Sequence, residues 1–133
     1  MIVVDSNIVA YLYMGGGYGS AAEALLDKDG EWAAPILWRS EFRNVLAGCL
    51  RRGDLALEKA RAMQSEAEEF MRGAEYDMDS GSVLDLVDRS DCSAYDCEYV
   101  ALAMQLGTKL VTMDSQVLRA FPAVAVSLKE EAP

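Results

Sequence analysis

Short apolar runs alternate with longer segments of helical periodicity along this chain. Ile2, Val3 and Val4 form a β-branched run that ends at Asp5, and a second apolar run over residues 109–112 leads to Asp114. Unbroken apolar runs of this length are typical of strands buried on both faces of a parallel sheet. The first and fourth predicted strands are therefore central strands, each followed closely by an acid.

The complete pattern predicts an α/β domain of three layers, α/β/α, with a mostly parallel sheet of about five strands. We expect one domain over residues 1–128 and a frayed tail over 129–133. The predicted strands are 2–4, 31–34, 75–78, 109–112 and 124–126. The predicted helices are 7–13, 20–28, 37–52, a helix that Asp54 caps and that reaches Arg72, 80–89, 94–106 and 115–119.

Four acids interrupt this pattern where apolar residues are expected. Asp5 and Asp114 follow strands, and ligands of open α/β sheets bind outside the carboxyl ends of strands. Glu41 lies on the helical stripe of Trp38 and Val45. Asp96 is spaced by four residues from Val100, on another inward face. Acids brought together in this way most simply form a cation site, since hard cations such as Mg²⁺ take oxygen ligands.

Each acid taken alone has a structural alternative, which the sequence leaves open. Asp5 and Asp114 are suitable N-caps for the helices that follow them. Asp96 could form a capping box with Ser93, and Glu41 could reach solvent from the edge of its stripe. The prediction of a site depends on the set of four, because a chain with 22 acids contains some by coincidence.

Composition removes several chemistries. The chain contains no histidine, which excludes Ser-His-Asp and Cys-His catalysis and histidine-based metal sites. Carboxylates must therefore carry any chemistry. Cys49, Cys92 and Cys97 are odd in number and lack zinc-ligand spacing, so we expect them to be small core or surface residues.

The net charge of −10 argues against non-specific affinity for nucleic acid. Charge is uneven, however, since residues 36–62 are basic overall and residues 63–98 are strongly acidic. Arg39 and Arg43 in the basic segment are candidates for holding a substrate backbone, although a mixed, solvated helix surface is the simpler reading. No apolar segment is long enough for a membrane span or a signal peptide, so we expect a cytoplasmic protein without membrane contact.

Four motifs in order give the chain a resemblance to PIN-domain ribonucleases, most closely the VapC-like toxins of bacterial and archaeal toxin–antitoxin pairs. They are the opening Val-Val-Asp5-Ser6-Asn7, Glu41 in the third helix, the segment 93–103 (SAYDCEYVALA), and Leu-Val-Thr112-Met-Asp114. The resemblance spans nearly the whole length.

This resemblance implies an endoribonuclease that depends on Mg²⁺ or Mn²⁺. Asp5, Glu41, Asp96 and Asp114 would be its catalytic acids. Asp5, Asp96 and Asp114 would be metal ligands, and Asn7 and Thr112 would orient carboxylates or water.

Many relatives carry a further acid where this chain has Gln116, which leaves open whether one or two ions bind. The resemblance also implies a homodimer and a small VapB-type antitoxin whose C-terminal arm blocks the acidic cleft. Apolar helix residues such as Leu46, Leu50, Leu55 and Leu57 could form the dimer interface, although core packing is their commoner fate.

Two other functions remain possible at this stage. A haloacid-dehalogenase-like phosphatase also begins with Asp after a first strand, but it needs a second Asp where this chain has Asn7. A PIN-like module that binds RNA or protein without turnover would carry the same acids.

Overall fold

The computed structural model describes residues 1–132 and contains a five-stranded sheet in the order β3-β2-β1-β4-β5. Every strand pairing is parallel, which confirms the predicted sheet. The strands are β1 (Ile2–Val4), β2 (Trp32–Pro35), β3 (Glu75–Tyr76), β4 (Leu110–Thr112) and β5 (Ala125–Ser127).

The strand order reverses at β1. The chain moves outward from β1 through β2 to β3, and then crosses back to place β4 on the other side of β1. Val3 consequently pairs with Ala33 of β2 and with Leu110 of β4. Ligands of open α/β sheets bind at such a switch point, outside the carboxyl ends of the strands. Asp5 directly follows β1, and Asp114 follows β4 by two residues.

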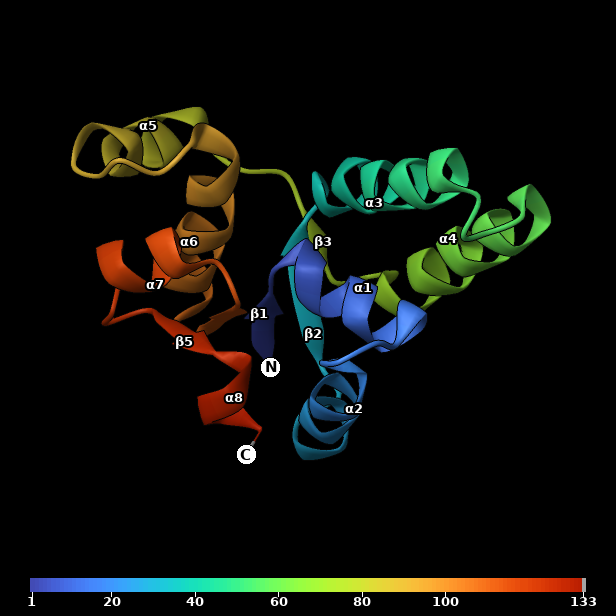
Figure 1. The fold of residues 1–133 in the computed structure, drawn as a ribbon. Helices are drawn as coiled ribbons and strands as arrows, with labels where there is room; N and C mark the ends of the chain where they lie inside the picture. Colours follow the sequence, from blue (N-terminus) through green and yellow to red (C-terminus); the bar gives the residue numbers. More distant parts are fainter. Residues whose placement is uncertain (133) are drawn as a thin grey trace.

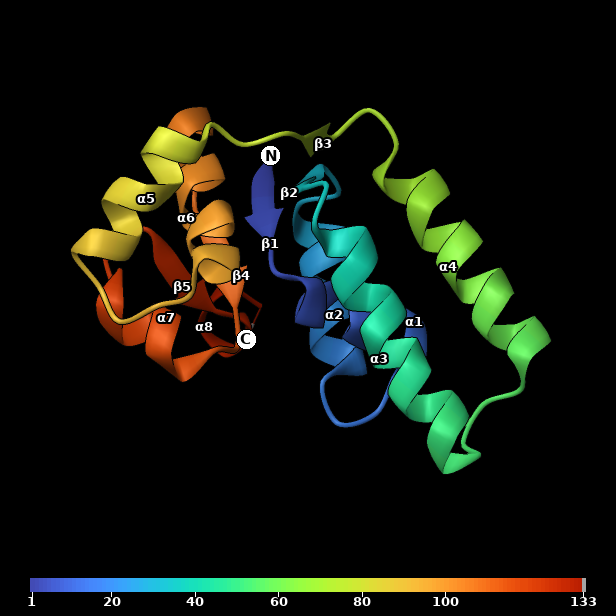
Figure 2. The same cartoon turned by 90° about the horizontal axis from the view of Figure 1, so that it is seen from above.

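Helices cover both faces of the sheet, which gives the three layers that the sequence predicts. Helix α6 (Ala94–Leu106) contacts β1, β2 and β4, and α5 (Ser80–Asp88) packs on α6. Helices α1 to α4 lie on the opposite side of the sheet from α5 and α6 (Figures 1 and 2). The other helices are α1 (Ser6–Met14), α2 (Gly19–Lys28), α3 (Trp38–Arg52), α4 (Leu57–Met71), α7 (Ser115–Ala120) and α8 (Leu128–Glu131).

The most apolar segments lie at the centre of these layers. All residues of β1 and β4 are buried, because helices cover both faces of the central strands. Helix α6 is buried without interruption from Tyr99 to Ala103, since it lies between the sheet and α5. Its central side chains are apolar, and its two acids, Asp96 and Glu98, lie near its beginning.

The link between α3 and α4 differs from the prediction. Gly53 ends α3 in a left-handed conformation (φ 77°), as a glycine after a helix is expected to do. Helix α4 begins only at Leu57, and its N-cap is Ala56 rather than Asp54. The Asp54 carboxylate instead accepts a hydrogen bond from Arg52 Nε at 3.0 Å. The ion pair with Arg52 takes the place of the expected cap.

The end of the chain also differs from the frayed tail that we expected. Residues Leu128–Glu131 form α8, and Leu128 is buried. Glu131 forms ion pairs with Lys28 of α2 at 3.3 Å and with Lys109 at 3.4 Å. These contacts join α8 to the rest of the domain, while Pro133 lies outside the described residues.

The three cysteines are buried and unbonded, as predicted for small core residues. Among residues 1–132, no helix combines the length and apolar character that a membrane crossing requires.

Candidate active site

Asp5 lies at the switch point with its carboxylate directed toward β4. Only 9% of the residue is exposed. Thr112, the last residue of β4, donates its hydroxyl to Asp5 Oδ2 at 2.7 Å, and Ser6 Oγ lies 3.4 Å from Oδ1. Asp5 precedes α1, but its side chain makes no capping hydrogen bond. Asp5 therefore does not cap α1 with its side chain. Thr112 instead holds the Asp5 carboxylate at the edge of the sheet where the strands end.

Thr112 also connects Asp5 to Asp114. The backbone N–H of Asp114 donates to Thr112 Oγ1 at 3.0 Å. Asp114 Oδ1 accepts from the N–H groups of Gln116 and Val117, so Asp114 does cap α7. Asp114 thus acts as the N-cap that the sequence allowed. The cap uses only Oδ1, and Oδ2 accepts no hydrogen bond from the described residues. A cap and a ligand role are compatible for this residue.

Glu41 is held by a buried tyrosine. Tyr99 of α6 is only 2% exposed and donates its hydroxyl to Glu41 Oε1 at 2.6 Å. This bond joins helices on opposite sides of the sheet, since Glu41 belongs to α3. Burial beside Glu41 raises the pKa of Tyr99, so the phenol keeps its proton and remains a donor. Glu41 Oε2 is free of hydrogen bonds to described residues.

Asp96 lies in the first turn of α6. Ser93 caps this helix by accepting a hydrogen bond from the Asp96 backbone N–H at 3.1 Å. The Asp96 side chain is half-buried and shares its surroundings with Asp114 and Asp5, whose charges act on one another. Ser93 also acts on the Asp96 carboxylate by hydrogen bonding, which lowers its pKa, but burial and the charge of Asp114 outweigh this effect.

Electrostatic repulsion among the four acids is uncompensated. Burial raises the pKa of Asp5 to about 6, and the charges of Glu41 and Asp96 add to this rise. Burial, and then the charge of Asp114, raises the pKa of Asp96. None of the four acids forms an ion pair with a Lys or Arg of residues 1–132. Such a group either takes up protons or attracts a cation.

The donor atoms suit a hard divalent cation, because all of them are oxygens. Asn7 Oδ1 is buried and has no hydrogen-bond partner in the described part of the chain, which adds an unused oxygen two residues from Asp5. In their present rotamers, no three Asp, Glu or Cys side chains among the described residues converge closely enough to hold an ion. Metal binding would therefore require at least one carboxylate to rotate inward.

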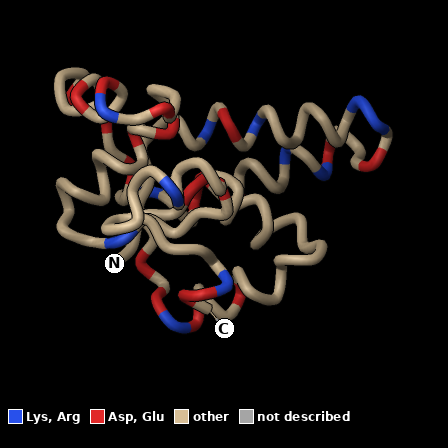
Figure 3. Tube along the Cα trace, turned by 60° about the vertical axis from the view of Figure 1, so that its left-hand side comes forward, with Lys and Arg blue, Asp and Glu red and all other residues tan. Residues whose placement is uncertain are grey.

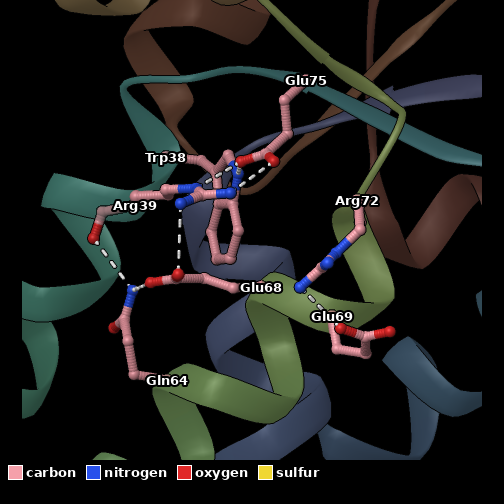
Figure 4. Close-up of polar contacts among 7 residues, drawn as sticks. All are labelled: Trp38, Arg39, Gln64, Glu68, Glu69, Arg72 and Glu75. Carbon is pink, nitrogen blue, oxygen red and sulfur yellow. Dashed lines mark hydrogen bonds and ion pairs between the residues drawn. The ribbon is translucent and has the colours of Figure 1, made fainter.

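Arg39 pairs with two glutamates of the fold and is not free to bind a substrate, which differs from the role suggested by its charge. Its Nε and Nη2 donate to the two Glu75 oxygens at 2.6 and 2.7 Å, and Nη1 donates to Glu68 at 3.1 Å (Figure 4). Trp38 Nε1 donates to the same Glu75 carboxylate at 2.7 Å. This network fastens α3 to β3 and α4. The positive charge of Arg39 is used within the fold.

Arg43 differs from Arg39, because it is exposed and forms no ion pair among the described residues. The same is true of Arg51 and Lys59 on α3 and α4. Figure 3 shows several Lys and Arg positions near the tip of the α3–α4 hairpin, whereas Asp and Glu predominate around α5. Three unpaired cations of the described chain, Arg43, Arg51 and Lys59, thus lie along α3 and α4.

No role is predicted from the sequence for two polar residues of the site, Ser6 and Tyr99, although both lie in the motifs of the family resemblance. Tyr99 holds Glu41, and Ser6 contacts Asp5. Tyr99 could have been found from its spacing, since it follows Asp96 by three residues on a buried stripe and a buried tyrosine hydroxyl usually needs a partner. The chain offers no comparable signal for Ser6.

Known proteins with similar sequence or structure point to one family. Ribonuclease VapC3 of Pyrobaculum aerophilum is 32% identical over 126 residues, which cover 92% of this chain and 96% of that protein.

Solved structures share the fold at lower identity. The crystal structure of PAE2754 from Pyrobaculum aerophilum matches with a TM-score of 0.76 at 20% identity, over 97% of this chain and 84% of that one. A chain of a toxin–antitoxin complex from Klebsiella pneumoniae matches with a TM-score of 0.69 at 15% identity, over 96% and 98% of the two chains.

The family model of the PIN domain matches residues 2–124, which include all four acids and the strands β1 to β4, while β5 follows directly after the matched range. Together with the parallel five-stranded sheet, this match identifies the fold and its lineage. The chain belongs to the PIN domain family.

Proposed function

We propose that this protein is a Mg²⁺- or Mn²⁺-dependent endoribonuclease that hydrolyses RNA phosphodiester bonds. The observation that carries the proposal is that the charges of Glu41 and Asp96 act on Asp5, and that of Asp114 on Asp96, without a balancing Lys or Arg from residues 1–132. The relative named Ribonuclease VapC3, similar over nearly its whole length, supports RNA as the substrate.

Asp5, Asp96 and Asp114 would hold the ion. When bound, it would neutralise charge on the scissile phosphate and lower the pKa of an attacking water. Thr112 fixes one oxygen of Asp5, and Asp114 keeps Oδ2 available while Oδ1 caps α7. Gln116 donates its side-chain amide to the Asp91 carbonyl at 3.0 Å, so it adds no carboxylate to the site. We therefore expect a single ion.

Glu41 would orient the attacking water and accept its proton. Tyr99 holds Glu41 Oε1 at 2.6 Å, so only Oε2 is left to face the reacting groups. Asn7 Oδ1, which is buried and unpartnered among residues 1–132, would accept a hydrogen bond from the same water. Arg43 would contact the RNA backbone, because it is exposed on α3 and forms no ion pair among the described residues.

The biological role that we propose is that of the toxin in a toxin–antitoxin pair. Structural similarity to a chain of the Klebsiella pneumoniae toxin–antitoxin complex supports this role. A small VapB-type antitoxin would block the site by inserting a basic side chain among the four acids, which have no cation of their own in the described chain.

We also propose a homodimer. Leu57, at the start of α4, is 52% exposed, while Leu46 is buried in the core and is unavailable for an interface. Sedimentation at several protein concentrations tests this assembly, and a monomer at micromolar concentration would contradict it.

Cleavage assays with matched variants test the enzymatic proposal. The wild type, D5N and D88N are incubated with single-stranded and structured RNA in Mn²⁺, Mg²⁺ or EDTA. We expect metal-dependent cleavage by the wild type and by D88N, whose exposed acid lies on α5 away from the switch point. In D5N, the rate should fall at least about 10³-fold, since loss of a metal ligand costs several kcal/mol of transition-state stabilisation.

Undiminished cleavage by D5N would remove Asp5 from the mechanism. If the wild type binds RNA and metal without cleaving, the protein is instead a PIN-like binding module. The phosphatase alternative is disfavoured by membership of the PIN family, and release of phosphate from p-nitrophenyl phosphate would revive it.

A further inference from the structure

A second feature lies beside the acids, a pocket of about 400 Å³ that shares two residues with the site. Ser6 and Glu41 are the two lining residues that also belong to the site. Leu37 and Val45, which lie on the same face of α3 as Glu41, line the pocket together with Tyr95 of α6. The pocket therefore continues the proposed active site toward α3 and the first turn of α6.

Tyr95 is unusual among the aromatic residues because it is 63% exposed. Tyr99, one turn later on the same helix, is 2% exposed and donates to Glu41. Helix α6 thus presents two tyrosines on adjacent turns of one face, an inner one that holds Glu41 and an outer one in the pocket wall. The inner tyrosine is part of the core, whereas the outer ring makes no hydrogen bond with residues 1–132 and has a free face.

The chemistry of the pocket restricts its occupant. Its one charged residue is Glu41, so an anionic phosphate is not expected inside it. Leu37, Val45 and the Tyr95 ring offer apolar surface to a flat, neutral group. Asn44 and Ser40 contribute an amide and a hydroxyl that can bond to the edge of such a group. An aromatic base has this combination of an apolar face and a polar edge.

We propose that this pocket binds an unpaired nucleobase of the RNA substrate, stacked on Tyr95 and hydrogen-bonded by Asn44, next to the scissile phosphate. This inference rests on the proposed ribonuclease function and specifies its substrate class as single-stranded or looped RNA. A base in a duplex is already stacked and paired, so it cannot enter the pocket without being extruded. Tyr95 is then a substrate-positioning residue.

The position of Arg43 agrees with this arrangement. Arg43 precedes Asn44 on α3, is exposed, and has no ion-pair partner in the described chain. It can contact a phosphate outside the pocket while the base lies within it. The pocket and its rim together provide separate places for the neutral base and for the charged backbone.

Binding of a short RNA tests the proposal without relying on catalysis. A fluorescent 12-nucleotide single strand and its duplex are titrated in EDTA with wild type, Y95A, Y95F, Y95W and M104A. Met104 is the matched control, because it is an exposed apolar residue at the other end of α6. We expect Y95A to weaken single-strand binding by about 5- to 150-fold, the range for loss of one stacked base. Duplex binding should not change, and Y95F, Y95W and M104A should resemble the wild type.

Abasic nucleotides then locate the stacked base. One abasic position should weaken wild-type binding by a similar factor and cause no further loss in Y95A, because both changes remove the same contact. With Mn²⁺ present, Y95A should raise KM for the single strand and leave kcat nearly unchanged.

Three results would overturn the assignment: equal binding by Y95A and wild type, losses that add between Y95A and every abasic position, or a change in the oligomeric state of Y95A in sedimentation. The last result would place the ring in a contact between copies of the chain. Failure of the ribonuclease proposal shows separately, as cleavage that D5N retains, because the binding experiment contains no metal.

Discussion

Two groups of charged residues in this protein illustrate opposite uses of carboxylates. Around Arg39, Glu75 and Glu68 are paired with a guanidinium at 2.6 to 3.1 Å (Figure 4), and hydrogen bonding from Arg39 holds the pKa of Glu75 below its usual range. At the switch point, Asp5 is more deeply buried, and burial together with the charges of Glu41 and Asp96 raises its pKa to about 6. The direction of the pKa shift separates a carboxylate that is paired within the fold from one whose charge the fold leaves unbalanced.

The contrast shows why an arginine near an acidic site is weak grounds for substrate binding. Arg39 lies two residues before Glu41 in the sequence, yet it bonds to β3 and α4. Arg43, two residues after Glu41, is uncommitted among the described residues. Two arginines at equal distances from Glu41 in the sequence thus differ, because only Arg39 meets carboxylates of neighbouring elements.

The largest expected effect on the fold comes from D5N in metal-free buffer. Because the folded state raises the pKa of Asp5, it retains a proton that the unfolded state releases between about pH 4 and pH 6. Wild-type stability should therefore fall as the pH rises through this window, and D5N should escape the fall. At pH 7.5 we expect D5N to be more stable by about 2 to 3 kcal/mol in urea unfolding.

This gain should disappear below about pH 3, where Asp5 of the wild type is largely neutral in both the folded and the unfolded state. A D5N protein as stable as the wild type at both pH values would contradict the picture of an uncompensated buried charge.

R39M should act in the opposite direction. It leaves Glu75, whose side chain is 11% exposed, without its ion-pair partner, so the free energy of unfolding should fall by about 1 to 3 kcal/mol. Cleavage per folded molecule should be unchanged. R52M is the control, since Arg52 and Asp54 are both largely exposed and their pair should contribute no measurable stability. A large loss of cleavage in R39M with normal stability would return Arg39 to the active site.

Y99F should impair cleavage more than stability. The variant removes the 2.6 Å hydrogen bond that fixes Glu41 Oε1, and we expect kcat to fall about tenfold, as for loss of one hydrogen bond to a charged group. Single-turnover cleavage by Y99F and Y95F is the measurement, with Y95F expected to retain kcat. Equal kcat in Y99F and wild type would show that Glu41 needs no support from α6.

R43M should have the smallest effect. If Arg43 contacts one phosphate, its loss should raise KM a few-fold and make the logarithmic salt dependence of RNA binding shallower by about 0.7. R89M removes an exposed, unpaired arginine of the described chain at the end of α5, and it should leave both quantities unchanged. An identical response in R43M and R89M would show that Arg43 acts on RNA only through the overall charge of the protein and not through a specific phosphate contact.

Much of the fold could be predicted from local pattern. The apolar runs of β1 and β4 predict their burial, and α6 begins and ends at the predicted residues because Ser93 and Gly107 give clear helix boundaries. Local sequence pattern gave a wrong prediction where contacts with residues far away in the sequence determine the secondary structure. α8 persists because Glu131 meets Lys28 and Lys109, which come from other parts of the chain.

The candidate site follows the same division. Strand ends predict that Asp5 and Asp114 are neighbours, because parallel strands bring their carboxyl ends to one edge. The resemblance implies an orienting role for Thr112, but the residue pattern alone does not show that Thr112 connects the two acids, or that Tyr99 reaches Glu41 across the layers. Such contacts depend on side-chain geometry that has no local signature.

The central claim is that the four acids form one cation site, and calorimetric titration with Mn²⁺ tests it most directly. We expect wild type and D88N to bind one Mn²⁺ per chain, and D5N and D96N to bind it at least about 100-fold more weakly, or not at all. Undiminished binding of Mn²⁺ by D5N and D96N would show that the ion binds elsewhere, and the account would fail.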